Sequence, residues 1–236
     1  MGGMRMQWLL LGGMGALVLR AAGRVRLYRC AGMPRAARRR YLAASWALGL
    51  TILAAMAVQE GALLFSGQLS WQNALPLHLC SLLGLLTLPT LLTRRPLLLN
   101  AAFFAGVPGA ALALLFPAVL QTPWPRVTAL AFHTLHAGLV CAPLLPLGMG
   151  WRLRPWGALG AWCFLVTAAA LATFANRITG GNYFFLAGPV AGTPLMWLAG
   201  QGVLLYRLGL MALVTLALAA EGVGLYFLYR HMRVKT

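Results

Sequence analysis

The chain has 236 residues, of which 61% are apolar and only 9% are charged, and its mean hydropathy is +0.80. These few polar side chains cannot cover the surface of a soluble protein. The composition therefore excludes a water-soluble globular protein and indicates a polytopic membrane protein. The net charge of +17 lies in short segments between apolar runs, a pattern of membrane topology rather than of nucleic-acid binding. We therefore expect membrane lipids as partners and no nucleic acid, while the oligomeric state stays unknown.

Seven apolar runs are long enough to cross about 30 Å of hydrocarbon, which takes roughly 20 helical residues. They lie near residues 6–23, 42–65, 75–92, 97–118, 127–148, 155–175 and 201–228. The loops between them are short and no soluble domain is inserted. We predict an all-α fold, a polytopic transmembrane bundle of about seven helices that forms a single domain over residues 1–236. The region 180–200, which glycine and proline interrupt, has room for a re-entrant segment.

The basic residues divide unequally between the two sides of this predicted bundle. Fifteen lie in the junctions of one side and four on the other. Because loops rich in arginine and lysine stay in the cytoplasm, we predict that the N-terminus is outside and the C-terminus cytoplasmic.

The four cysteines lie far apart, with no Cys-x-x-Cys pair and no spacing typical of metal ligands. We therefore expect no disulfide framework, no metal site and no cofactor. Cys141 and Cys163 are interpreted as small apolar residues. Cys80 differs, because it follows His78 near the start of an apolar helix that Pro76 introduces.

Cys80 and two histidines are predicted to lie at similar depths. At 1.5 Å per residue, Cys80 is about 8 Å below the outer start of the third helix. His133 and His136 are about 9 and 14 Å below the outer start of the fifth, so all three side chains can meet in the outer half of the bilayer. His78 is about 200° from Cys80 around a helix, so the two do not face one cavity unless Pro76 distorts the turn. For the three histidines a structural hydrogen bond and a site role both stay open.

The chain contains only two acidic residues. Glu60 ends the second helix on the predicted outer side. It either orients a histidine, pairs with Arg207, or is an exposed helix-end carboxylate. Glu221 is near the predicted cytoplasmic end of the last helix, and we interpret it as part of a structural ion pair.

Three motifs follow one another along the chain: Leu-Pro-Leu-His-Leu-Cys at 75–80, Leu-His-Ala-Gly-Leu at 135–139, and Gly-Asn-Tyr-Phe-Phe-Leu at 181–186. In this order they resemble the YwaF family of bacterial integral membrane proteins, over roughly residues 55–228. That family is related to the animal ether-phospholipid acyltransferase known as transmembrane protein 164. The resemblance implies seven transmembrane helices, a bacterial cytoplasmic membrane, and acyl transfer between glycerophospholipids through a cysteine acyl-enzyme. After the Asn-Tyr element the chain lacks the aspartate of the family pattern.

The resemblance assigns a role to one residue of each motif. Cys80 is expected to be the nucleophile, His136 the general base and Asn182 a donor to the oxyanion. The residues expected to bind substrate are His78, Glu60, His133, Tyr183 and Arg207. The alternative is a transporter or small-solute-binding protein with an outward-facing pocket lined by Glu60, His78, His136, Asn182 and Arg207. A purely structural membrane factor is a third possibility.

Overall fold

The computed structural model describes residues 34–149, 151–189, 193 and 195–234, and within them every regular element is helical, as predicted. The elements are α2 (Arg35–Phe65), α3 (Leu79–Thr93), α4 (Pro96–Asn100), η1 (Ala101–Gly106), α5 (Val107–Leu115), α6 (Pro125–Cys141), α7 (Leu144–Gly148), α8 (Gly157–Thr179), η2 (Tyr183–Phe185), α9 (Leu195–Ala199) and α10 (Val203–Val234).

Five stretches of the described chain are long and apolar enough to span a membrane: Arg35–Phe65, Pro96–Leu115, Pro125–Gly148, Gly157–Thr179 and Val203–Phe227. The shorter apolar helix α3 is the counterpart of the predicted helix 75–92. The first predicted helix, near residues 6–23, lies outside the described residues.

Helix α3 begins four residues later than the sequence predicted. Its 15 residues start at Leu79, which gives a length of about 22 Å. The residue before a proline is disfavoured in the helical conformation, so Pro76 keeps Leu75 out of a helix. His78 is also extended, with φ −76° and ψ 147°, and takes the N-cap position. Residues 75–78 therefore form part of a loop over the end of the bundle.

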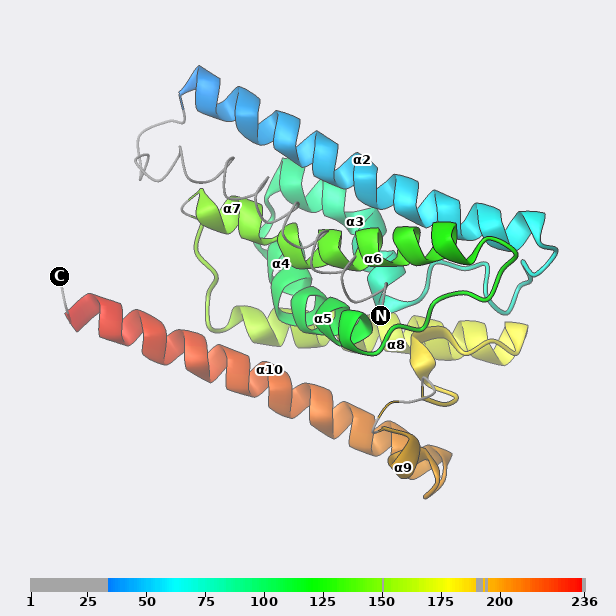
Figure 1. Cartoon of the computed structure of the whole chain (residues 1–236). Coiled ribbons are helices and arrows are strands. Elements are labelled where there is room, and N and C mark those ends of the chain that lie inside the picture. Colours follow the sequence, from blue (N-terminus) through cyan, green and yellow to red (C-terminus); the bar gives the residue numbers. More distant parts are fainter. Residues whose placement is uncertain (1–33, 150, 190–192, 194, 235–236) are drawn as a thin grey trace.

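The long helices run back and forth along one direction, so that their ends gather at two ends of the bundle (Figure 1). At one end lie three connecting segments, residues 66–78, 116–124 and 180–188, and we call this the capped end. At the other end, which we call the basic end, lie the start of α2, the junction of α3 and α4, the segment between α7 and α8, and the end of α10 (Figure 1). These segments contain Arg35, Arg38, Arg39, Arg40, Arg94, Arg95, Arg152, Arg154 and Arg230. The arginine groups of the predicted cytoplasmic side thus share one end, as far as the structure describes them, and the orientation in a membrane stays a prediction.

Helix α3 packs closely between α2 and α6. Ile52 of α2, Leu83 of α3 and Leu135 of α6 belong to one buried apolar cluster. A Cβ atom on Gly84 would lie 2.5 Å from Met56 Sδ and 3.4 Å from Leu135 Cδ1, so the absence of a side chain lets the three helices approach.

The predicted helix 97–118 is divided by a wider, π-helical turn. This turn, η1, separates α4 from α5 and ends just before Pro108. A proline inside a helix lacks an N–H group, and its ring clashes with the carbonyl group one turn earlier. The π-helical turn is a local way of accommodating such a residue.

Candidate functional site

A polar cavity of about 140 Å³ lies at the capped end, between the last turns of α2 and the first turn of α3. Five polar side chains in one small cavity are a strong concentration for a chain in which 61% of residues are apolar. The residues that line it are Met56, Gln59, Glu60, Leu63, Asn73, His78, Ser81 and Leu120.

His78 connects this cavity with the segment 180–188. Its ring centroid is 5.5 Å from that of Tyr183 and 4.9 Å from that of Phe185. Its Nδ1 atom is buried and has no hydrogen-bond partner. Buried polar atoms are rarely left without a hydrogen bond, so the Nδ1 atom of His78 is an unused hydrogen-bonding atom in the cavity wall.

Cys80 is the second residue of α3 and packs against the buried cluster between α2, α3 and α6. It does not line the polar cavity, whereas Ser81 does. His78 is the N-cap of α3 and Ser81 is the third residue of the helix, so both lie at the start of α3 beside the cavity. The thiol group is free and forms no hydrogen bond to His136 within the described part of the chain.

The first turn of α3 has backbone N–H groups without intrahelical acceptors. The first bond of this helix runs from the N–H of Leu82 to the carbonyl of His78, and no side chain caps the turn. The N–H groups of residues 79–81 therefore precede the hydrogen-bonded part of the helix. Together with the helix dipole they favour negative charge beside Cys80.

The two histidines of α6 are buried and bonded to their own helix. His133 Nδ1 is 2.6 Å from the carbonyl oxygen of Ala129, and His136 Nδ1 is 2.7 Å from that of Phe132. A carbonyl oxygen only accepts, so in a neutral ring Nδ1 carries the proton and Nε2 keeps the lone pair. The bond to Phe132 therefore leaves Nε2 as the basic atom of His136.

Asn182 closes a turn of its own segment. Its Nδ2 group donates to the carbonyl of Gly188 at 3.0 Å, and its Oδ1 accepts from the N–H of Ala187 at 2.8 Å. Neither interaction reaches the cavity or Cys80. The amide group that the family resemblance assigns to the oxyanion thus holds residues 182–188 together.

Tyr183 joins the capping segments and is fully buried. Its hydroxyl group donates to the carbonyl of Trp71 at 2.8 Å and accepts from the N–H of Leu75 at 3.0 Å. Asn176, near the end of α8, holds the backbone of Tyr183 with two hydrogen bonds, at 2.7 and 3.0 Å. Tyr183 therefore positions the segment that carries His78.

Arg207 is not paired with Glu60, which was one of the interpretations left open. Its Nε atom donates to the carbonyl of Leu186 at 2.8 Å. The preceding residue, Tyr206, donates from its hydroxyl group to the carbonyl of Phe185 at 2.7 Å. The start of α10 thus holds the end of η2, while Glu60 lines the cavity with His78.

The sequence-based selection missed Ser81, Asn73 and Phe185 as site residues. The spacing of three between His78 and Ser81 was a usable signal. Asn73 lies in a loop and Phe185 contacts His78 from a distant segment, so no local periodicity marks them.

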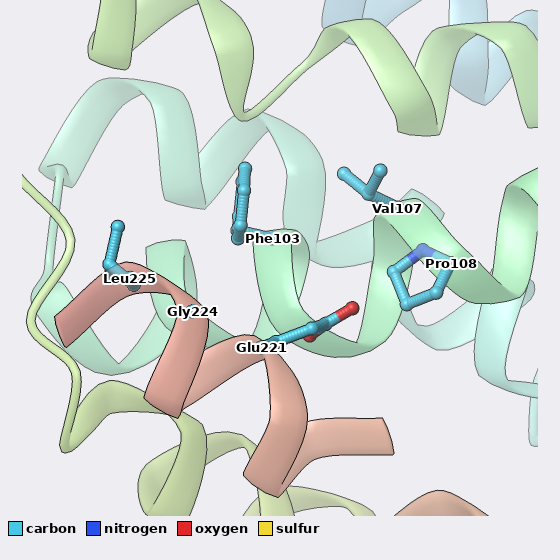
Figure 2. A pocket seen from close by; sticks show the side chains of 6 residues that line it. All are labelled: Phe103, Val107, Pro108, Glu221, Gly224 and Leu225. Carbon is cyan, nitrogen blue, oxygen red and sulfur yellow. The ribbon is translucent and has the colours of Figure 1, made fainter. Parts of the chain in front are cut away.

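The predicted ion pair of Glu221 is wrong within the described residues. Its Oε2 atom is buried without a hydrogen-bond partner, and the side chain lines a second cavity, of about 280 Å³. The reason is its position on the helix: its neighbours in space are apolar residues of η1 and α5 (Figure 2), while Arg207 and Arg230 lie fourteen residues before it and nine after it on α10.

An uncharacterized protein of Treponema pallidum (strain Nichols) is 32% identical over 120 residues, which cover 50% of this chain and 49% of that protein. The match thus spans about half the length of this relative. No solved structure matches the chain. A family model does match, over residues 4–220, and the chain therefore belongs to the TMEM164 family.

Proposed function

We propose that this protein is a membrane-embedded acyltransferase or transacylase that moves an acyl chain between phospholipids through a thioester on Cys80. One observation carries the proposal: the thiol lies in the uncapped first turn of α3, two residues after His78 of the polar cavity. Membership of the TMEM164 family supports it, through the ether-phospholipid acyltransferase to which the sequence motifs relate the chain.

The first chemical step forms the thioester. The Cys80 thiolate attacks the carbonyl carbon of a phospholipid ester, the ester C–O bond breaks, and the lysolipid leaves with a proton. His136 Nε2 takes the proton from the thiol and returns it to the leaving oxygen. In the second step the hydroxyl group of an acceptor lipid attacks the thioester and restores the thiol.

The tetrahedral intermediates carry negative charge on the former carbonyl oxygen. The N–H groups of Cys80 and Ser81 are the donors we assign to it, because the helix leaves them without acceptors and its dipole has the right sign. The side chain of Asn182 is already used for its turn. Burial opposes formation of the thiolate, and the proposal requires the helix terminus and the histidine base to offset this.

We assign the polar part of the lipid substrate to the polar cavity. At about 140 Å³ it is smaller than the range of roughly 300–1,000 Å³ typical of whole small-molecule ligands. It has room for part of a head group next to the glycerol, while the acyl chains stay in the bilayer. Glu60, His78 and Ser81 then contact the substrate without taking part in bond breaking.

The same cavity favours a second candidate, a binding site for a small polar solute. Glu60 and His78 line it as this alternative expected, and His136, Asn182 and Arg207 are not among its lining residues. The two functions differ in what they require of Cys80, which only acyl transfer needs.

The test is to incubate the purified protein in nanodiscs with a phospholipid radiolabelled in its acyl chain, and to measure label on the protein. We expect label that neutral hydroxylamine releases, no label on Cys80→Ala, and full label on Cys163→Ala, which removes an exposed thiol of α8. Full acyl exchange by Cys80→Ala would eliminate the thioester. Absence of label with every phospholipid class would favour the solute-binding function.

A further inference from the structure

The second cavity lies between α10 and the turn where η1 meets α5, and Figure 2 shows the Glu221 side chain extending from α10 toward Val107 and Pro108. Its volume is about 280 Å³. The lining residues are Phe103, Val107, Pro108, Glu221, Gly224 and Leu225. Apart from the one carboxyl group, all these side chains are hydrocarbon, so the cavity combines an apolar wall with a single polar group.

The cavity shares no lining residue with the polar cavity. Within the described part of the chain, the most apolar window of α10 is only 11% buried, which leaves this helix open to acyl chains. A Cβ atom on Gly222 would lie 3.2 Å from the carbonyl oxygen of Pro155, just before α8, which places this part of α10 toward the basic end. Glu221 is six residues before Phe227, the end of the apolar span, and so about 9 Å inside it.

We propose that this cavity binds the hydroxyl end of an uncharged long-chain lipid, with the hydroxyl group hydrogen-bonded to Glu221. The Glu221 carboxyl group lines the cavity, and its Oε2 atom has no hydrogen-bond partner, so the group has acceptor capacity to offer. A hydroxyl group brings one donor, which one carboxyl oxygen satisfies, and it accepts in return when the carboxyl group is protonated. An ammonium group would bring three donors to a cavity with one polar side chain, and donors left unpaired in hydrocarbon are strongly unfavourable.

The volume of this cavity limits the size of the group that can enter it. It is slightly below the range of roughly 300–1,000 Å³ for complete small-molecule ligands. The cavity therefore takes the polar end and the first methylene groups, and the rest of the chain lies along the exposed face of α10. Hydroxyl-bearing lipids such as long-chain alcohols and diacylglycerols have this form.

The experiment uses photocrosslinking in nanodiscs of phosphatidylcholine, which has no hydroxyl group of its own. The probe is hexadecanol with a diazirine in its chain, and mass spectrometry locates the crosslinked peptides. Unlabelled hexadecanol, hexadecyl methyl ether and hexadecylamine serve as competitors. We expect crosslinks to η1, α5 and α10, and competition by hexadecanol roughly tenfold stronger than by the ether, as loss of one buried hydrogen bond predicts.

Two variants test the carboxyl group and the space of the cavity separately. Glu221→Leu removes the carboxyl group and should abolish the advantage of the alcohol over the ether. Gly224→Leu should reduce crosslinking roughly tenfold by filling the cavity, since nothing lies within 4 Å of a Cβ atom there, while Gly224→Ala is the matched control. Wild-type protein offers a further measurement, because the chain has only two acidic residues and dicyclohexylcarbodiimide should modify Glu221 more slowly when hexadecanol is present.

Three outcomes would overturn the proposal. If hexadecyl methyl ether competes as well as hexadecanol, binding rests on apolar contact alone. If hexadecylamine competes more strongly than hexadecanol, the ligand is cationic. Carbodiimide modification of Glu221 that hexadecanol leaves unchanged means that the hydroxyl group does not reach the carboxyl group.

Discussion

The imidazole ring of His78 lies against the phenol ring of Tyr183, with the centroids 5.5 Å apart and the planes tilted by 55°. The two residues belong to the first and third sequence motifs, which are about a hundred residues apart. The Tyr183 hydroxyl group also holds the backbone on either side of the loop that leads to His78, at Trp71 and Leu75. Two motifs that look independent in the sequence thus form one wall of the capped end.

Replacing Tyr183 by phenylalanine should destabilise the protein by about 1–3 kcal/mol, because the N–H of Leu75 and the carbonyl of Trp71 both lose a buried partner. Thermal unfolding in nanodiscs measures this as a lower Tm. Tyr226→Phe is the control, because Tyr226 is 53% exposed on α10. Equal Tm values for the two variants would contradict the role of Tyr183.

Gly181→Ala should separate the capping segments. A Cβ atom there would lie 2.6 Å from the backbone carbonyl oxygen of Gln72, which cannot move as a side chain does. Overpacking of this kind typically destabilises by about 1–3 kcal/mol. Gly188→Ala, in the same segment but with nothing within 4 Å, should stay within about 0.5 kcal/mol of the parent protein. Denaturant titration checks both, and a neutral Gly181→Ala variant would show that the two segments do not touch as described.

His136→Ala should slow both formation and breakdown of the Cys80 thioester by a factor of about 10²–10⁴, the usual effect of losing a general base. Rapid quenching of the radiolabelled acyl-enzyme gives the two rates. His231→Ala removes an exposed histidine near the end of α10 and should leave both unchanged. Unchanged rates for His136→Ala would move the base to another residue.

The orientation is tested with single cysteines in a background without the four native ones. Gln72→Cys places a thiol at the capped end and Arg95→Cys places one at the basic end, and both positions are exposed. In intact cells a membrane-impermeant maleimide should label position 72, and position 95 only after lysis. The reverse pattern would invert the topology.

The sequence predicts the helices well because hydrophobicity decides which stretches enter a membrane. It predicts their starts poorly, as at α3, where Pro76 and a hydrogen bond from Leu75 to a distant tyrosine keep four residues out of the helix. In the structure α3 packs against α6, but similar depth in the sequence does not show which helices are neighbours. It gives no information on how the loops fold over the ends.

The site residues, like the helices, are only partly predictable from the sequence. His78 and Glu60 line one cavity, as their location near one membrane surface suggested. Asn182 and Arg207 instead hydrogen-bond to backbone atoms of residues 186–188, and such partners leave no pattern in the sequence. Ionisable residues near one surface can therefore be found from the sequence, but which of them face a ligand depends on contacts between distant loops.

The dependence of the loop before α3 on Tyr183 has a consequence for biosynthesis. The partners Leu75 and Tyr183 are 108 residues apart in the chain. At roughly 5–20 residues per second, the ribosome adds Tyr183 about 5–20 s after Leu75. During that interval the N–H of Leu75 and the ring of His78 lack their final neighbours. The nascent chain thus has a defined period in which an insertion factor or chaperone that shields polar groups would act, and truncated chains that end before η2 should be degraded rather than accumulate.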